Sequence, residues 1–262
     1  MIVICYGMPK SASSFTFQLA AALVDCKYKV YKSLPEEDSL YINKLELGTY
    51  NNTYTSLPER VKSHFFLKSL YIDKLDQAIY DLVDTLPSDQ VLVIKTHSPL
   101  SKPIESVLES GNALAIVNYR NPYDIIVSLK DVGERERLKE KSKQRPEFAW
   151  IKSIDDTKRN IRGIVSTAKT WLDKKSESLL CISYQSIEKT PLNVALDIDK
   201  FIQLNLKPSS IRTIVDGFIS DKSKIGEYNV GVSGRGAEIS FTESDKKLVE
   251  EMDSFIYLYL KR

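Results

Sequence analysis

The sequence contains only two histidines and three cysteines among its 262 residues. Cys5, Cys26 and Cys181 are too few and too scattered for a disulfide framework or a cysteine-rich zinc site. Cys5 and Cys181 lie within apolar runs, so we expect both to be small buried side chains. Histidine chemistry has two candidates, His64 and His97.

The chain also has a low net charge and lacks long apolar runs. The 37 basic and 35 acidic residues leave a formal net charge of +2, which argues against a surface that binds nucleic acid or a membrane as a whole. No apolar stretch approaches the roughly 18 residues of a membrane span. The N-terminal apolar run ends at Gly7 with no basic region before it, unlike a signal peptide. We therefore expect a cytoplasmic protein with no membrane span. If this protein binds an anion, a local cluster of basic residues has to bind it.

The sequence does contain short β-branched runs that alternate with longer helical patterns. This alternation predicts an α/β fold with a mainly parallel central sheet and helices on both faces. No repeat and no Gly/Ser-rich linker interrupts it, so we expect residues 1–262 to form a single domain. The predicted strands are residues 2–6, 91–95, 113–119 and 179–184, with a weaker one at 27–31, and the predicted helices lie near residues 13–24, 64–86, 122–131, 157–174, 191–204 and 243–260.

The first predicted strand runs into a loop of small and hydroxyl residues, Pro9-Lys10-Ser11-Ala12-Ser13-Ser14-Phe15. A strand, such a loop and a helix start suit an anion, because the helix-start N–H groups and the Lys10 ammonium attract negative charge. The loop is not a Walker A motif, since Ala12 and Ser13 stand where that motif needs Gly and Lys. The alternative is a plain strand-to-helix turn with Ser13 as the N-cap.

The second predicted strand leads into Lys95-Thr96-His97. This order places an ammonium and an imidazole two residues apart, on the same side of the chain, at the carboxyl end of a strand. Ligands of open α/β sheets bind at these ends. A histidine in this position is either part of such a site or a structural residue.

The third predicted strand ends at Arg120, just before a helix. Asn121 suits the N-cap, Pro122 the first helical position and Asp124 the first turn, so these three have a structural explanation. Arg120 and Ser128 are left over. A fork-shaped cation and a hydroxyl at a helix start suit a terminal phosphate.

In order and spacing, the three segments resemble the PAPS-dependent sulfotransferase family, in particular its cytosolic-type members that act on small hydroxyl compounds. The family patterns P-K-S-G-T-T-W, K-T-H-x-P and R-x-P-x-D-x-x-V-S stand here as residues 9–15, 95–99 and 120–128. Residues 183–187 resemble the family's strand that ends in Y-E-D-L, and Trp171 resembles the tryptophan of its preceding helix. The resemblance covers residues 1–242 and implies a P-loop-like strand, loop and helix that binds a 5′-phosphosulfate.

The resemblance also implies a role for each residue. The donor would be 3′-phosphoadenosine 5′-phosphosulfate (PAPS), released as adenosine 3′,5′-bisphosphate (PAP), and no metal would take part. His97 would accept the acceptor's proton, Lys95 would stabilise the transferring sulfonate, and Lys10 would stabilise the departing oxygen. The family assigns the 5′-phosphosulfate to Lys10, Ser11, Ala12, Ser13 and Ser14, the 3′-phosphate to Arg120 and Ser128, and the adenine pocket to Phe15, Tyr184 and Phe218.

The chain departs from the family pattern at three places. Ala12 replaces the loop glycine, which tightens the turn, and Phe15 replaces a tryptophan while keeping a flat face for adenine. Residues 231–236 only partly match the family's late R-K-G-x-x-G element, because residues 229–230 are Asn and Val instead of the basic pair. Arg235 is the candidate for the missing guanidinium, from a different backbone position.

The acceptor would be a small molecule with a hydroxyl or phenolic group, bound by residues 32–60, the helix after them and residues 130–150. Residues 130–145 carry seven basic and four acidic residues, so they form either a solvated charged segment or a lid. Nothing in the sequence indicates a homo-oligomer, and nothing excludes one. The aromatic candidates for the acceptor site are Tyr41, Tyr50, Tyr54, Phe65, Phe66, Phe148 and Trp150.

Two other functions remain open. A P-loop-like nucleotide kinase would share the strand, loop and helix, but the chain lacks the G-K-[ST] sequence and an obvious Mg²⁺-holding aspartate after an apolar strand. A non-catalytic nucleotide-binding protein would keep the same fold, and the incomplete late element favours it.

Overall fold

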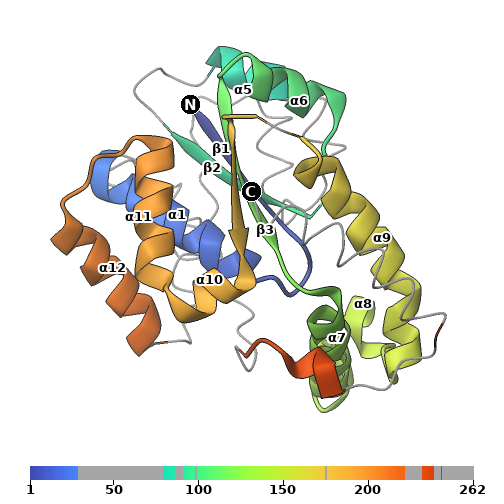
Figure 1. The fold of residues 1–262 in the computed structure, drawn as a ribbon. Helices are drawn as coiled ribbons and strands as arrows, with labels where there is room; N and C mark the ends of the chain where they lie inside the picture. Colours follow the sequence, from blue (N-terminus) through green and yellow to red (C-terminus); the bar gives the residue numbers. More distant parts are fainter. Residues whose placement is uncertain are drawn as a thin grey trace.

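A computed structural model describes residues 1–28, 79–85, 91–97, 99–174, 176–221, 232–238 and 243. Four strands in this part of the chain form one parallel sheet in the order β2-β1-β3-β4 (Figure 1). Cys5 of β1 stands opposite Lys95 of β2 and Ile116 of β3. The sheet confirms the predicted α/β fold. The strands are β1 (Ile2–Gly7), β2 (Leu92–Thr96), β3 (Ala113–Tyr119) and β4 (Leu179–Ser183).

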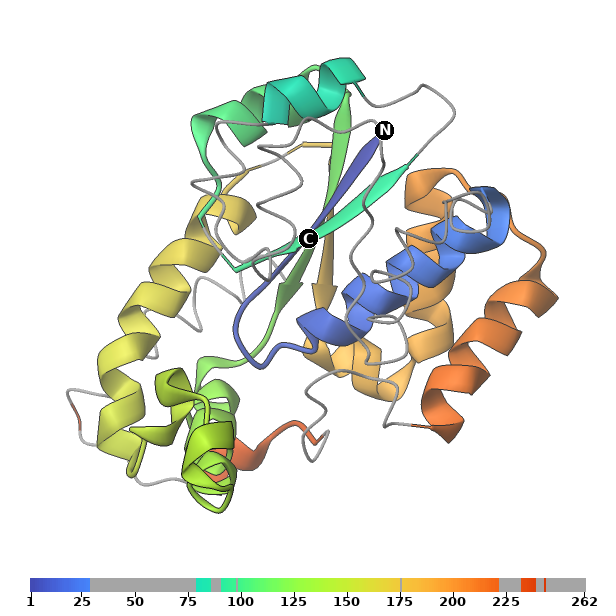
Figure 2. The same cartoon turned by 180° about the vertical axis from the view of Figure 1, so that it is seen from behind.

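Helices cover both faces of the sheet, as predicted (Figures 1 and 2). One face, which includes Val3 and Cys5, packs against α1 (Ser13–Tyr28), α11 (Pro191–Ile202) and α12 (Pro208–Ser220). The other face, which includes Ile4 and Tyr6, packs against α5 (Ile79–Thr85), α6 (Lys102–Glu109), α7 (Pro122–Arg137) and α9 (Ile154–Leu172). The shorter elements are η3 (Lys141–Lys143), α8 (Pro146–Ala149), α10 (Tyr184–Lys189) and η5 (Arg235–Glu238).

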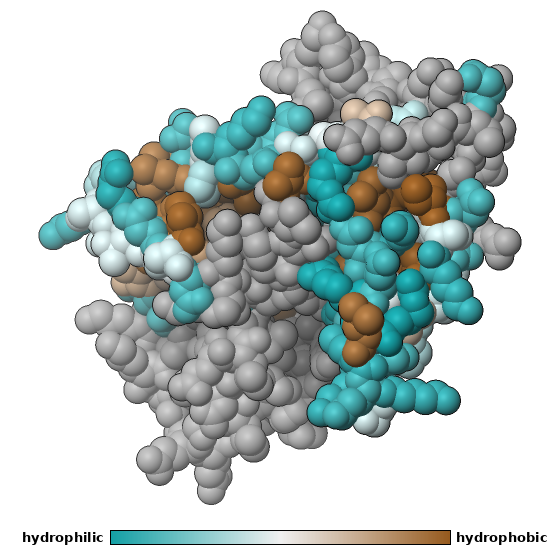
Figure 3. Space-filling view, turned by 90° about the horizontal axis from the view of Figure 1, so that it is seen from below, coloured by the Kyte–Doolittle hydropathy of each residue, from teal (hydrophilic) through white to brown (hydrophobic). Residues whose placement is uncertain are grey.

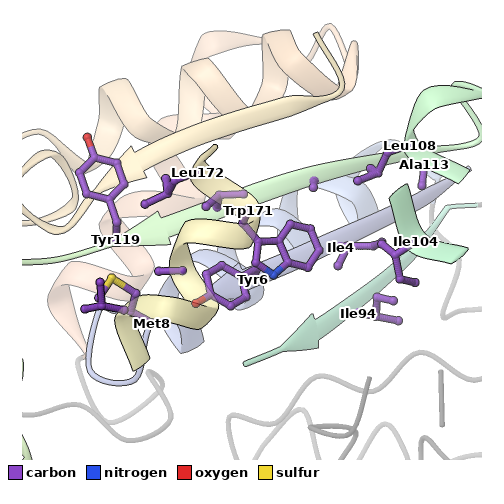
Figure 4. Close-up of a cluster of buried hydrophobic side chains, with 14 of the residues drawn as sticks. Ile4, Tyr6, Met8, Ile94, Ile104, Leu108, Ala113, Tyr119, Trp171 and Leu172 are labelled. Atoms are coloured by element: carbon purple, nitrogen blue, oxygen red, sulfur yellow. The ribbon is translucent and has the colours of Figure 1, made fainter. Parts of the chain in front are cut away.

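An aromatic pair joins the carboxyl end of β1 to α9 (Figure 4). The rings of Tyr6 and Trp171 stack with centroids 5.1 Å apart and planes 18° apart. Both side chains are fully buried, and such a pair adds about 0.5–1.5 kcal/mol to the stability that area burial supplies. Burial raises the pKa of the Tyr6 hydroxyl, which stays protonated at neutral pH. The stack holds the end of β1 against α9. The loop predicted to suit an anion, residues 9–15, follows this end, and we call it the phosphate loop.

The start of α7 follows the predicted pattern. Asn121 is the N-cap and accepts a hydrogen bond from the Tyr123 backbone N–H at 2.8 Å, and Pro122 occupies the first turn. The helix runs to Arg137, further than the predicted end at residue 131. Capping signals therefore located the beginning of this helix better than its end, because no glycine or proline marks the end.

Two predictions about the fold are wrong. Residues 27 and 28, expected in a strand, form the last turn of α1, where the cationic Lys27 complements the helix dipole and its ammonium donates to the Gln203 carbonyl at 3.2 Å. Cys181 is exposed, whereas Cys5 is buried as expected. In β4 the neighbouring Ile182 points into the core, so Cys181 points to the opposite face.

Several expectations lie outside the described residues or are only partly covered. The helix predicted over residues 64–86 is described only as α5, and His64 and most of the helix at 243–260 are not described. Sequence analysis missed α6 and α12, although each carries a proline in its first turn, which is a helix-start signal. The single domain over residues 1–262 stays a prediction.

Exposed large hydrophobic residues on the described surface lie on separate elements. Leu138 follows α7, Trp150 follows α8 and Ile219 belongs to α12. Figure 3, which views the molecule from below Figure 1, shows hydrophobic residues in separate spots between hydrophilic ones. No described helix has the length and apolar character needed to cross a membrane.

Half of the residues in the charged segment 130–145 are exposed, and the segment is organised around one buried carboxylate. The Glu136 side chain is 2% exposed and pairs with Arg145 at 2.6 Å and Lys139 at 2.8 Å. The Arg145 backbone N–H and Nε also donate to it. Burial alone would raise the pKa of Glu136, but these hydrogen bonds lower it to about 2. The exposed residues fit the solvated segment that we considered, and a lid role stays a prediction.

Glu136 predicts an acid-dependent loss of stability. Because the pKa of Glu136 is depressed, its ionised carboxylate stabilises the fold fully when the pH is above the ordinary glutamate pKa of 4.5. This stabilisation is lost as the pH falls towards about 2. In urea unfolding, Glu136→Gln should lower the free energy of unfolding at pH 7, and its difference from wild type should shrink at pH 3. Glu140→Gln is the control, since its pair with Lys143 is 71% exposed on both sides. A wild-type advantage that is equal at both pH values would contradict this role.

Candidate active site

The candidate site lies where the segments after β1 and β3 diverge. The β1 loop leads into α1, which covers one face of the sheet, and β3 leads into α7, which packs on the other. The two strands are neighbours and parallel, so their carboxyl ends form a topological switch point. Ligands of open α/β sheets bind in the crevice at such a point.

The loop after β1 has the backbone shape of an anion site. Lys10 and Ala12 both have φ of 64°, with Ser11 between them. Left-handed residues alternating with right-handed ones turn successive N–H groups towards one point, which is the geometry of an anion-binding nest. Ser11 stabilises the turn by donating to the Met8 carbonyl from its backbone N–H at 3.1 Å and from Oγ at 2.6 Å.

The same loop folds tightly back onto its strand. A Cβ added at Gly7 would lie 2.2 Å from the Ser13 Cβ, so no other residue fits there without movement. α1 begins at Ser13, which places the positive end of its dipole directly at the carboxyl end of β1. The loop is therefore both a strand-to-helix turn and a site suited to an anion.

Lys95 crosses from β2 to this helix start. Its ammonium donates to Ser14 Oγ at 2.8 Å. Lys95 also stands opposite Cys5 in the sheet, and although burial raises the pKa of the Cys5 thiol to about 12, the Lys95 charge acts in the opposite direction. Cys5 stays protonated and unreactive, and Lys95 adds a positive charge to the phosphate loop.

His97 is placed by the end of β1. Its Nδ1 lies 2.5 Å from the Gly7 carbonyl oxygen. Since a carbonyl can only accept, Nδ1 carries the hydrogen, and Nε2 is the basic nitrogen of the neutral ring. A hydrogen bond that orients the ring and selects this tautomer is what a general base requires.

Arg120 connects the phosphate loop with the segment after β3. Its Nη1 donates to the Lys10 carbonyl at 2.9 Å and its Nη2 to the Val232 carbonyl at 2.8 Å. The guanidinium carbon lies 3.7 Å from the centroid of the Tyr184 ring, and Nε lies 3.7 Å from Asp124 Oδ2. Burial lowers the pKa of Arg120 below its ordinary value, and the nearby Tyr184 and Asp124 offset only part of this effect.

The predicted adenine residues separate into two groups. Phe15 and Phe218 form an edge-to-face pair with centroids 5.7 Å apart, whereas Tyr184 lies against Arg120. Ser128 is buried on α7, one turn after Asp124. The structure thus places Tyr184 next to Arg120, one of the two predicted 3′-phosphate residues.

The predicted acceptor residues are only partly described. Phe148 packs under the Arg145 guanidinium, with its ring centroid 4.7 Å from Cζ, and Trp150 Nε1 donates to the Glu147 carbonyl at 3.0 Å. The other five aromatic candidates lie outside the described residues. In the described part of the chain, no group of three His, Cys, Asp or Glu side chains is arranged to hold a metal ion.

Two carboxylates that organise the site were not predicted as site residues. Asp124 was explained as a first-turn residue, but it also accepts hydrogen bonds from the backbone N–H groups of Gly234 and Gly236 at 2.9 and 2.8 Å. Asp131 pairs with Arg235 at 2.7 Å. The spacing of Asp124, Ser128 and Asp131 on one helix face was the available signal.

The fold and these contacts define an α/β protein with a loop suited to an anion at a topological switch point. The sulfotransferase-domain family matches residues 2–232, and the chain belongs to this family. No curated protein sequence matches the chain.

Solved structures agree with this assignment at the level of the fold. Retinol dehydratase in complex with androsterone and PAP is 17% identical with a TM-score of 0.52, and the match covers 99% of this chain and 80% of that one. Retinol dehydratase with retinol and PAP is 16% identical with a TM-score of 0.55, over 99% and 81% of the two chains. Mouse sulfotransferase SULT7A1 with PAP is 16% identical with a TM-score of 0.55, over 96% and 82%.

Ala12 generates a stability prediction. A non-glycine residue in the left-handed region costs about 1–2 kcal/mol, and glycine costs about 0.4–1 kcal/mol in the unfolded chain. Ala12→Gly should therefore raise the free energy of unfolding by about 0.5–1 kcal/mol, measured by urea titration. Ala22→Gly, within α1, should lower it by about the same amount. Destabilisation by Ala12→Gly would show that Ala12 is not strained.

Proposed function

We propose that this sulfotransferase-family chain transfers a sulfonate group from PAPS to a hydroxyl group of a small-molecule acceptor, with His97 as the general base. The observation that carries the proposal is the contact between His97 Nδ1 and the Gly7 carbonyl. It makes Nε2 the basic nitrogen of an oriented imidazole, at the same strand end from which Lys95 contacts Ser14. A base and an anion site in one place are what sulfonate transfer to a hydroxyl requires.

The residues present fit the donor, which is a dense anion joined to an adenine. Lys10 and the backbone of residues Ser11 to Ser14 suit the 5′-phosphosulfate, because the loop combines a nest with a helix start. Among the described residues, the buried Nε of Arg120 has no hydrogen-bond partner. That Nε faces the Asp124 carboxylate at 3.7 Å, so a buried guanidinium stands at the start of α7 near the Ser128 hydroxyl, and such a pair suits a terminal phosphate, which supports Arg120 and Ser128 as the 3′-phosphate residues.

The adenine pocket follows from the aromatic contacts. Phe15 and Phe218 present an edge-to-face pair at the start of α1 and in α12. Tyr184 lies under Arg120, so we place it between the adenine and the 3′-phosphate. Arg235 is the fourth cation that we assign to the donor site.

The chemistry divides between the donor and the chain. When bound, the donor supplies an electrophilic sulfur with a phosphate leaving group. His97 Nε2 accepts the proton of the acceptor hydroxyl while the new O–S bond forms and the S–O bond to the phosphate breaks. Lys95 stabilises the charge of the transferring group, and Lys10 stabilises the electron pair that remains on the departing phosphate oxygen. No side chain forms a covalent bond.

The acceptor proposal rests on chemistry and on relatives. The structural neighbours were solved with androsterone and with retinol, which are small molecules that carry a hydroxyl group. A hydroxyl or phenolic acceptor suits a histidine base, which has to remove only one proton. We also propose that the chain acts in the cytoplasm without nucleic acid, since its three free cysteines suit a reducing compartment.

Calorimetric titration tests the donor assignment. The protein should bind PAP tightly and bind ATP with Mg²⁺ at least about tenfold more weakly, because Arg120 and Ser128 are specific to a 3′-phosphate. Adenosine 5′-monophosphate is the matched control, since it lacks only that phosphate. Tight binding of ATP with Mg²⁺ and none of PAP would instead support a nucleotide kinase.

Substitution of His97 tests the mechanism. His97→Ala should reduce kcat at least about 100-fold, because a general base contributes about 10²–10⁴ to the rate. Its affinity for PAP should stay within about twofold of wild type, since the imidazole is not assigned to the nucleotide. Sulfonate transfer would be followed with a phenolic acceptor and PAP affinity by calorimetry. Unchanged turnover would remove His97 from the mechanism, and a wild-type protein that binds PAP without turnover would indicate a non-catalytic binding protein.

A further inference from the structure

Residues 232–236, which we call the late segment, lie against α7 (Figure 1). Asp124 accepts the backbone N–H groups of Gly234 at 2.9 Å and Gly236 at 2.8 Å. The approach is close enough that a Cβ added at Gly236 would lie 2.3 Å from the Tyr123 Cβ. Asp124 therefore fixes the backbone on both sides of Arg235.

Two more contacts hold the beginning of the late segment. The Val232 carbonyl accepts from Arg120 Nη2 at 2.8 Å. The Ser233 backbone N–H donates to Glu188 of α10 at 3.2 Å, and the Ser233 hydroxyl also contacts that carboxylate. The late segment is thus joined to the end of β3, to α7 and to α10, which surround the candidate 3′-phosphate residues.

The Arg235 side chain runs along the same face of α7. Its Nη1 pairs with Asp131 Oδ2 at 2.7 Å. Asp124, Ser128 and Asp131 are spaced by four and three residues, so they share one helix face. Ser128 lies between the carboxylate that holds the Arg235 backbone and the carboxylate that holds its guanidinium. The positive charge of Arg235 also lowers the pKa of Arg120, as expected for neighbouring guanidinium groups.

We infer that Asp124 is a positioning residue of the donor site, which places Arg235 beside Ser128 to bind the 3′-phosphate. The inference rests on the proposed function. It explains how the site works although Asn229 and Val230 stand where the family pattern has two basic residues. Arg235 was already the candidate for the missing guanidinium, and the contacts of Asp124 explain what holds it in place.

The physical reason is the cost of ordering a long cation. An arginine on an untethered segment loses backbone and side-chain freedom when it binds a phosphate. The two hydrogen bonds to Asp124 fix the backbone of Arg235 in advance, so less entropy is lost on binding. The negative charge of Asp124 is offset by these two N–H groups and by Arg120.

Asp124→Asn is the first test, with PAP and adenosine 5′-monophosphate as the probes in calorimetry. An amide presents one acceptor instead of two, so one glycine N–H is released. PAP should bind at least about tenfold more weakly, while affinity for the monophosphate changes less than about twofold. Glu134→Gln, an exposed carboxylate on the same helix, should change neither affinity. An equal loss for both nucleotides would overturn the inference.

A double-mutant cycle tests whether Asp124 acts through Arg235. Arg235→Ala should weaken PAP binding in the wild-type background and have no further effect in the Asp124→Asn background. If the two losses multiply instead, the residues act independently and the inference is wrong. No effect of Arg235→Ala in wild type would also overturn it.

A third variant covers the case in which Asp124→Asn does not fold. Gly236→Ala keeps every charged group but forces the late segment away from Tyr123, so it should reduce the preference for PAP over the monophosphate in the same way. If the wild-type protein itself has no such preference, the proposed donor site fails. If wild type has it and Gly236→Ala retains it fully, only the role of the late segment fails.

Discussion

The buried guanidinium of Arg120 joins the segments on which the site depends. Burial of a cation is costly unless it is paired and hydrogen-bonded, and here two carbonyls, one carboxylate and one aromatic ring share the task. The carbonyls belong to Lys10 and Val232, which are 222 residues apart in a chain of 262. The Arg120 side chain therefore links the phosphate loop, the start of α7 and the late segment, and the contacts of Asp124 and Glu188 add to this link at the late segment.

This arrangement explains how a nearly neutral chain binds a strongly anionic donor. Lys10 and Arg120 follow β1 and β3, and Lys95 lies near the carboxyl end of β2, so their charges gather at one edge of the parallel sheet. Acidic residues that balance this charge, Asp124 and Asp131, contact Arg120 and the late segment. Asp124 faces glycine N–H groups and Arg120. The net charge of +2 describes the whole surface and not the local field at the site.

Most of the candidate site could be predicted because its residues follow strands whose apolar runs are easily recognised. His97 and Arg120 were predicted at strand ends in this way. The structure confirms Asn121 as the predicted N-cap of α7. The pairing of Asp124 with Gly234 and Gly236 could not be predicted, since it joins segments 110 and 112 residues apart. Cys181 was wrongly expected to be buried because local apolar character does not reveal which face of a strand is covered. Lys27 was wrongly expected in a strand because α1 continues through it to Tyr28.

The sequence by itself determined the four strands of the sheet, the loop after the first strand and the identity of the charged residues at the strand ends. These features depend on periodicity, capping and residue chemistry, which are local. The tertiary structure alone decided that Arg120 holds the phosphate loop, that Gly7 orients His97 and that Arg235 lies along α7. Each of these contacts joins distant segments, and only the packing of helices on the parallel sheet brings them together.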